Sequence, residues 1–219
     1  MKILHLFDHS IPLHSGYTFR SRAILQQQAA MGFQTCHVTS PKQGVCQQPH
    51  ETVDGLSFYR TAVPTQWWAK MPLLDQLALI PAMKQRLLEV IAKEQPDVIH
   101  AHSPALNGMA ALQAGREVGL PVVYEVRAFW EDAAVDHGTC REGDWRYRAT
   151  RALESYVLKH ADAVTTICEG LRQDMVARGI AADKITVIPN AVNVQQFEVI
   201  DQADAALQQQ LGLTDSIVL

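Results

Sequence analysis

The sequence lacks the short motifs that mark several large classes of enzyme. It contains no G-x-G-x-x-G, no G-x-x-x-x-G-K-S/T, no H-E-x-x-H and no G-x-S-x-G. These absences remove support for dinucleotide-dependent dehydrogenases, P-loop enzymes, zinc proteases and α/β-hydrolases. The chain also has no D-x-D pair of carboxylates that could hold a divalent cation. We therefore expect no metal ion and no organic cofactor.

Cysteine, positive charge and long apolar runs are also scarce. The four cysteines form no C-x-x-C pair, and so few in 219 residues do not make a disulfide framework, which is typical of a reducing cytoplasm. The net charge is −4 and no basic tail is visible, so nothing favours binding to nucleic acid. The mostly apolar run before Asp8 has six residues, too few for a signal-peptide core or a membrane span. We expect a cytoplasmic protein.

Short β-rich runs alternate with segments of helical spacing along most of the chain, and 47% of the residues are hydrophobic. We expect strands at residues 2–7, 34–39, 53–59, 97–101, 122–126, 163–167 and 185–188. We expect helices at about residues 18–31, 74–94, 104–119, 144–160 and 169–178. Strands and helices that alternate at this spacing predict an α/β protein with a Rossmann-like, doubly wound and mostly parallel sheet.

Local signals refine three of these helices. Pro81 must start, kink or split the helix at 74–94, because proline lacks a backbone donor. Ser103 and Pro104 have the order of a helix N-cap followed by proline at the first helical position. The helix at 144–160 has one stripe in which we place Trp145, Ala149, Leu153, Tyr156 and His160.

Two loops that follow predicted strands carry polar residues suited to a ligand, and open α/β sheets bind ligands beyond the carboxyl ends of their strands. The first loop ends in His14, Ser15 and Gly16, where glycine permits close backbone approach and the next helix offers free N–H groups to a phosphate. An ordinary turn explains this pattern equally well. His100 and His102 project to one side of another strand end, and His102 lies nearer the loop. Packing, contact with an acceptor, or zinc binding without an obvious third ligand all stay open.

The segment after the predicted strand at 122–126 is the sharper candidate for a site. Arg127, Glu131 and Asp132 lie there beside Phe129 and Trp130. Carboxylates that bind hydroxyls and a flat ring that packs on a pyranose are the usual composition of a sugar site. Arg127 stays protonated at neutral pH, so we expect it to act as a cationic clamp and not as a base. The alternative is a structural pair between arginine and a carboxylate within the loop.

Two further groups of residues have a plain structural interpretation. Mixed charges near the helix at 144–160 are best explained as a solvated face, although any that point inward could contact phosphate; they include Arg141, Arg146, Arg148 and Arg151. Trp67 and Trp68 precede an apolar stretch and are expected to pack in the core. They could instead form a peripheral membrane contact that suits a lipid-linked acceptor.

The stretch at residues 161–197 carries a strand, a polar turn, a helix closed by Gly179, a second strand and the turn VIPNAVN at 187–193. This order and spacing resembles the end of the N-terminal domain in retaining glycosyltransferases of the GT-B fold, group 1 (family 4). Ala191 and Asn193 depart from the commonest form of the motif, which has glycine and aspartate there. A closer resemblance, to a subgroup associated with bacterial exopolysaccharide and exosortase gene clusters, is carried by HSxPxHSGYTFRSRAIL at 9–25, YEVRAFWED at 124–132 and RxLE at 151–154.

The resemblance implies a sugar transferred with retention of configuration from a nucleotide-sugar donor to a saccharide or lipid-linked acceptor, without a metal ion. It implies that the loop containing Gly16 lies near the donor diphosphate and the acceptor. It also implies that Arg127 contacts the reacting sugar, at a position where many relatives have histidine, and that Asn190 is a polar turn residue that could meet the ligand. Each of these roles is an expectation for this chain. A GT-B-fold epimerase of sugar nucleotides and a non-catalytic sugar-binding module stay open as alternatives.

The resemblance also implies a domain organisation. Residues 1–198 would form a Rossmann-like, acceptor-side domain, and residues 199–219 a linker with the start of a truncated donor-binding domain. The carboxylates that hold the donor in this family lie in that second domain. We therefore expect residues 1–219 alone to fold but not to transfer sugar.

Overall fold

The structure is a computed structural model that describes residues 1–44, 48–65, 74–194 and 204–213. By its internal contacts the chain divides into two units, Met1–Pro189 and Asn190–Leu219. The second unit contains the short helix α7 (Ala205–Gln210), whose first turn is capped by the Asp204 carboxylate. The first unit carries all the other elements. The predicted domain boundary at residue 198 stays a prediction.

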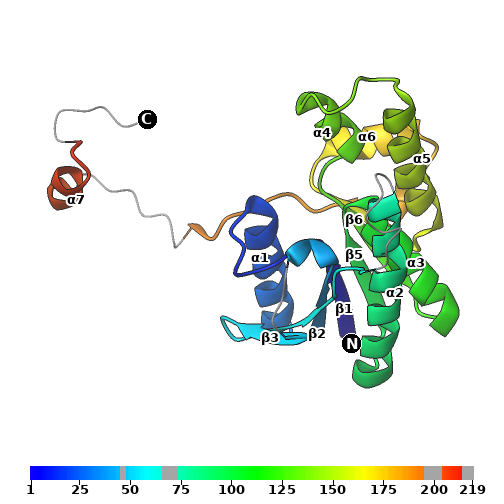
Figure 1. The fold of residues 1–219 in the computed structure, drawn as a ribbon, viewed down its shortest axis with the longest axis horizontal. Helices are drawn as coiled ribbons and strands as arrows, with labels where there is room; N and C mark the ends of the chain where they lie inside the picture. Colours follow the sequence, from blue (N-terminus) through cyan, green and yellow to red (C-terminus); the bar gives the residue numbers. More distant parts are fainter. Residues whose placement is uncertain (45–47, 66–73, 195–203, 214–219) are drawn as a thin grey trace. The chain divides into compact units, whose positions relative to one another are not determined.

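The first unit is an eight-stranded sheet with helices on both faces (Figure 1). Its strands are β1 (Lys2–Phe7), β2 (Gln34–Thr39), β3 (His50–Val53), β4 (Leu56–Arg60), β5 (Val98–His102), β6 (Val122–Val126), β7 (Ala163–Thr166) and β8 (Ile185–Val187). Its α-helices are α1 (Gly16–Ala30), α2 (Leu74–Glu94), α3 (Ala105–Val118), α4 (Trp130–Asp136), α5 (Trp145–His160) and α6 (Glu169–Ala177). Single 3-10 turns lie at Pro41–Gln43 and Ala182–Lys184.

The strand order is β3-β4-β2-β1-β5-β6-β7-β8, and every neighbouring pair is parallel except β3 and β4. This confirms the predicted Rossmann-like α/β fold. The chain adds strands to one side of β1 and then to the other side, beginning with β5. Open sheets of this kind bind ligands at such a reversal, beyond the carboxyl ends of the strands. The fold therefore directs attention to the ends of β1 and β5.

The two faces of the sheet are covered differently. Leu4 and Leu6 of β1 point to the large core beneath α2, α3 and α5, whereas Phe7 packs with Leu25 of α1 on the other face. Figure 1 shows α1 on one side of the sheet and α2 and α3 on the other. Successive strand residues alternate between the faces, so the large core takes one set of side chains and the α1 side takes the other. Polar residues gather on the α1 side.

Two local expectations about strand and helix ends were wrong. The predicted strand at 53–59 is a hairpin of β3 and β4, because Asp54 and Gly55 both adopt positive φ and form a tight two-residue turn. Helix α3 begins at Ala105 with Pro104 at the N-cap, so Ser103 is not the cap. Its hydroxyl is instead placed to accept from the backbone N–H of Arg127, at 3.4 Å.

The predicted stripe on α5 is not its buried face. Trp145 is 66% exposed and Tyr156 38% exposed, whereas the buried residues are Glu154, Val157 and Leu158. A buried glutamate accepts a hydrogen bond from Tyr124, and a pattern of apolar residues alone does not reveal such a position. Helix α4 was not predicted, and Pro81 lies inside an unbroken α2 that it neither starts nor splits. Among the described helices, none has the length and apolar character needed to cross a membrane.

Gly108 of α3 shows how closely the helices pack on the sheet. A Cβ atom at this position would lie 2.4 Å from Cγ1 of Val157 and 3.0 Å from Cε2 of Tyr124. We expect Gly108→Ala to lower the free energy of unfolding by about 1 to 3 kcal/mol through overpacking. Gly170→Ala is the matched control, because it is also helical and has nothing within 4 Å. Equal stability of the two variants in urea unfolding would contradict this packing.

Candidate functional site

The candidate site lies where the ends of β5 and β6 meet the first turns of α1. Glu125 of β6 is its central residue and is 2% exposed. Its Oε1 accepts from Nε of Arg20 at 2.8 Å and from Nε of Arg127 at 3.1 Å. Its Oε2 lies 2.9 Å from Nδ1 of His102. One buried carboxylate thus holds two guanidinium groups and an imidazole together.

The charges around Glu125 decide its ionisation. Burial alone would raise the pKa of Glu125, but His102 and Arg127 outweigh it and hold the pKa well below its usual value. The carboxylate is therefore charged at neutral pH. Two arginines beside one carboxylate leave this edge of the sheet with a net positive charge, which suits an anionic or hydroxyl-rich ligand.

Arg127 is fixed from several directions. Its Nη1 donates to the carbonyl of Tyr17 at 2.8 Å and lies 3.1 Å from Oγ of Ser21, and its guanidinium lies 4.1 Å from the Tyr17 ring centroid. The structure therefore brings Arg127 together with the start of α1. Its carboxylate partner is Glu125 in the strand, and not Glu131 or Asp132 in the loop.

Four histidines line the α1 side of the sheet, because the strand register places them in adjacent rows. His5 of β1 pairs in register with His37 of β2 on one side and with His100 of β5 on the other. His102 lies two residues after His100 on β5 and so points to the same face. Burial lowers the pKa of all four, to about 4 for His37, to about 3 for His100 and His102, and well below the usual value for His5. All are neutral at pH 7.

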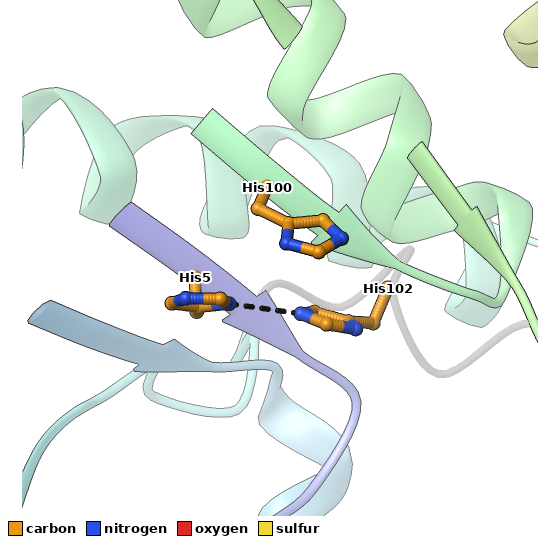
Figure 2. Close-up of side chains that lie close together, drawn as sticks. All are labelled: His5, His100 and His102. Atoms are coloured by element: carbon orange, nitrogen blue, oxygen red, sulfur yellow. Dashed lines mark hydrogen bonds between the residues drawn. The ribbon is translucent and has the colours of Figure 1, made fainter. Parts of the chain in front are cut away.

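His5, His100 and His102 lie close enough together to suggest a metal centre, and Figure 2 shows the three rings. His5 is the third histidine of this group, and the sequence did not reveal that it lies beside the other two. Nδ1 of His5 and Nε2 of His102 are 3.0 Å apart and share a hydrogen bond. The rings of His100 and His102 stack, with an interplanar angle of 27°. Stacked rings direct their in-plane lone pairs side by side, so they do not converge on one ion.

The geometry favours a hydrogen-bonded chain over a metal site. Oε1 of Gln28 can only accept, so neutral His5 donates to it from Nε2 and accepts at Nδ1 from Nε2 of His102. The side-chain amide of Gln28 on α1 lies 2.8 Å from Nε2 of His5 and ends the chain. At the other end of the chain, Nδ1 of His102 accepts from Nη2 of Arg127 at 2.9 Å, and the positive charge of this guanidinium disfavours a cation there.

The predicted residues of the first loop lie at the start of α1. Oγ of Ser15 accepts from the N–H of Thr18 and caps the helix. Gly16 is the first helical residue, and nothing lies within 4 Å of where its Cβ would be. His14 is exposed beside Phe19, with ring centroids 5.6 Å apart. Open space and free N–H groups therefore lie together at this helix end.

Glu131 and Asp132, the other predicted site residues of the first unit, have partners outside the group around Glu125. Glu131 is fully buried and forms an ion pair with Nη1 of Arg178 at 2.5 Å, which favours a structural role. Asp132 is exposed and accepts from the hydroxyl of Tyr147 at 2.9 Å. Asn190 is the exposed first residue of the second unit. Trp67 and Trp68 lie outside the described residues.

Sequence reasoning missed Glu125, Arg20 and His5. A charged residue inside the β-branched run VVYEV was a usable signal for Glu125, since a glutamate is rarely buried without a partner. Arg20 carried no such signal. It donates to the carbonyls of Ile188 and Pro189 as well as to Glu125, and so joins α1 to the end of β8.

Comparisons with known proteins agree with this architecture. A sulfoquinovosyl transferase, SQD2, of Arabidopsis thaliana is 24% identical over 184 residues, covering 84% of this chain and 33% of the relative. A GDP-mannose-dependent alpha-mannosyltransferase of Mycolicibacterium smegmatis is 25% identical over 200 residues, covering 87% of this chain and 50% of the relative. The chain thus spans a third to a half of the length of these relatives.

The structure of a sucrose-phosphate synthase from Thermosynechococcus elongatus has the same fold, with a TM-score of 0.70 at 16% identity over 97% of this chain and 53% of that chain. The family of glycosyl transferase 4-like domains matches residues 15–191, which include the strands and loops of the site. The chain belongs to the glycosyl transferase 4-like domain family.

Proposed function

We propose that this chain is the acceptor-side half of a retaining glycosyltransferase. The reaction moves a sugar from a nucleotide-sugar donor to a saccharide or lipid-linked acceptor, in bacterial exopolysaccharide or cell-envelope synthesis in the cytoplasm or at the inner membrane face. The observation that carries the proposal is the guanidinium of Arg127, held by Glu125 beside the open start of α1 at the point where the strand order reverses. The family membership supports sugar transfer as the reaction class.

Arg127 is the group that we assign to the substrate. A guanidinium keeps its charge at every working pH, so it can hold an anionic or hydroxyl group in place but cannot remove a proton. The side chain is 9% exposed, which leaves one edge for a ligand while three protein groups fix its position. A charge fixed in this way stabilises a reacting group without reorganising during the reaction.

The neighbouring residues take supporting roles. The free N–H groups after Ser15 and the space over Gly16 suit a phosphate or a sugar hydroxyl, and His14 borders this space from the exposed side. His102 is fully buried, so it acts as a positioning residue for Glu125 and not as a direct contact. Asp132 stays a candidate for binding acceptor hydroxyls because it is exposed.

We assign the donor mainly to a second domain. The chain spans half or less of the sulfoquinovosyl transferase and of the mannosyltransferase described above, and the second of these is named as GDP-mannose-dependent. Asn190 and the residues after it belong to the second unit, which we interpret as the link to that domain. Transfer then takes place between the two halves, with the acceptor positioned and dehydrated on this side.

The test is an assay of the complete gene product with a panel of nucleotide sugars. We expect release of nucleoside diphosphate that depends on an added saccharide or lipid-linked acceptor. NMR of the product should show the donor's anomeric configuration. Residues 1–219 alone should transfer no sugar. A changed sugar nucleotide without acceptor would instead show an epimerase. Binding without turnover of any donor would show a sugar-binding module, and either result would overturn the proposal.

A further inference from the structure

The outward side of α5 carries exposed aromatic residues next to exposed basic residues. We call this surface the α5 outer face, and it consists of Trp145, Arg148, Arg151, Tyr156 and Lys159, which lie on one side of the helix at its period of 3.6 residues per turn. All five are exposed, Trp145 to 66% and Tyr156 to 38%. The face is about 21 Å long from first residue to last, at the helical rise of 1.5 Å per residue.

The cations of this face are unpaired, although the protein as a whole is acidic. Ion pairs occupy surface cations elsewhere, such as Arg22 with Asp54, Lys84 with Glu117 and Arg172 with Glu169. Within the described ranges, the side chains of the three cations on the α5 outer face form no ion pair. The net charge of the whole chain is −4, so this is a local excess of positive charge.

No acidic side chain of α5 offsets this charge. Its one acidic residue, Glu154, lies on the opposite side, fully buried, and burial raises its pKa to about 8, so it is mostly neutral at pH 7. Arg116 of α3 extends the basic surface, since its Nη1 donates to the hydroxyl of Tyr156 at 3.2 Å. The face therefore presents cations beside two aromatic rings.

A shallow hollow of about 350 Å³ lies along the same helix. Its lining consists of Arg148, Arg151, Ala152, Ser155, Lys159 and Arg178. Arg178 is already neutralised by Glu131 and Asp174, which leaves two arginines, a lysine and a hydroxyl for a ligand. No acidic residue lines the hollow. Its size and its charge suit a phosphate-bearing headgroup.

We propose that the α5 outer face docks this protein on the surface of an anionic phospholipid bilayer. Tryptophan and tyrosine favour the headgroup region, and each lysine or arginine near an anionic leaflet adds to the attraction. An extended helix face with both kinds of residue fits a flat bilayer better than a single soluble anion.

The position of α5 relates this surface to the candidate site. The hydroxyl of Tyr147, near the start of α5, donates to Asp132 of α4, and α4 follows the strand end that carries Arg127. A bilayer on the α5 outer face would thus lie near the edge of the sheet where we place the acceptor. The inference that the acceptor is lipid-linked rests on the proposed function, whereas the inference that the protein docks on a bilayer does not.

The test is sedimentation of the full chain with vesicles of phosphatidylcholine alone or with about one third phosphatidylserine. Each cation contributes roughly a factor of five, so Arg148→Gln, Arg151→Gln and Lys159→Gln together should weaken binding to anionic vesicles on the order of 100-fold. The control combines Arg22→Gln, Lys84→Gln and Arg172→Gln, which changes the net charge equally but removes paired cations. We expect the control to bind like the parent chain.

Three results would overturn the proposal: equal binding to neutral and anionic vesicles, an equal loss in both triple variants, or binding of soluble polyphosphate with no vesicle binding. Trp145→Ala should also weaken vesicle binding, while Met31→Ala, another exposed apolar residue, should not. Circular dichroism and thermal unfolding check that the variants fold. Because vesicle binding needs no donor, it can succeed or fail independently of sugar transfer.

Discussion

Replacing Glu125 by glutamine is expected to lower the free energy of unfolding by about 3 to 5 kcal/mol, because it leaves buried positive charge uncompensated. The carboxylate accepts from two guanidinium groups, lies 2.9 Å from the His102 ring and is 2% exposed. An amide can accept from one guanidinium but brings its own donors toward the other cation. We therefore expect Arg20 and Arg127 to lose their fixed positions.

The same substitution should also lower acceptor kcat/KM by on the order of 100-fold, because a displacement of about 1 Å near the reacting groups has that effect. Urea unfolding and initial rates in the complete gene product measure the two consequences. Glu142→Gln is the control, since Glu142 is an exposed glutamate. A Glu125→Gln protein as stable as this control would contradict the charge arrangement that we describe.

Replacing Glu154 by glutamine is expected to remove one contribution to the pH dependence of stability, a loss that the parent chain undergoes as the pH rises from about 5 to about 8. The four buried histidines contribute in the opposite direction below about pH 6.5, equally in the parent chain and the variant. Burial raises the pKa of Glu154 to about 8, with Glu131 adding to the effect and the hydrogen bond from Tyr124 opposing it. The folded state therefore binds this proton more tightly than the unfolded chain does. The favourable contribution is complete below the unfolded pKa of 4.5 and is lost as the pH rises through about 8.

The size of this effect follows from the two pKa values. Each pH unit between them changes stability by about 1.4 kcal/mol, so the parent chain should lose on the order of 3 to 5 kcal/mol relative to Glu154→Gln from pH 5 to pH 8.5. Glutamine keeps an oxygen that can accept from Tyr124. Urea unfolding at a series of pH values provides the measurement. Parallel pH profiles for the parent chain and the variant would show that Glu154 is already ionised when folded.

Much of the fold was predictable because the strands are buried on both faces. The ranges expected for β1, β2 and β6 agree with the structure at both ends, because short β-rich runs bounded by turn residues mark such strands. Amphipathic patterns were less reliable on the surface. Helix α5 exposes Trp145 and buries Glu154, so the hydrophobic pattern indicated the wrong face.

The candidate site was predictable only in part. The position of Arg127 just past a buried strand indicated that it lies at the carboxyl end of that strand, and the structure has it there beside the start of α1. The role of Glu125 depends on three contacts across different elements, namely α1, β5 and its own strand end. No single segment of sequence contains those contacts. Asn190 belongs to the second unit, so its place in the site stays a prediction.

A double-mutant cycle on Glu125 and Arg127 tests the central claim most directly. The claim is that Glu125 serves the reaction by holding the guanidinium of Arg127 at the acceptor side. The measurement is acceptor kcat/KM for Glu125→Gln, Arg127→Ala and the double variant in the complete gene product, with refolding checked for each. We predict strong coupling, with the double variant no slower than Arg127→Ala alone. Full activity of Arg127→Ala, or losses that simply multiply, would contradict the account.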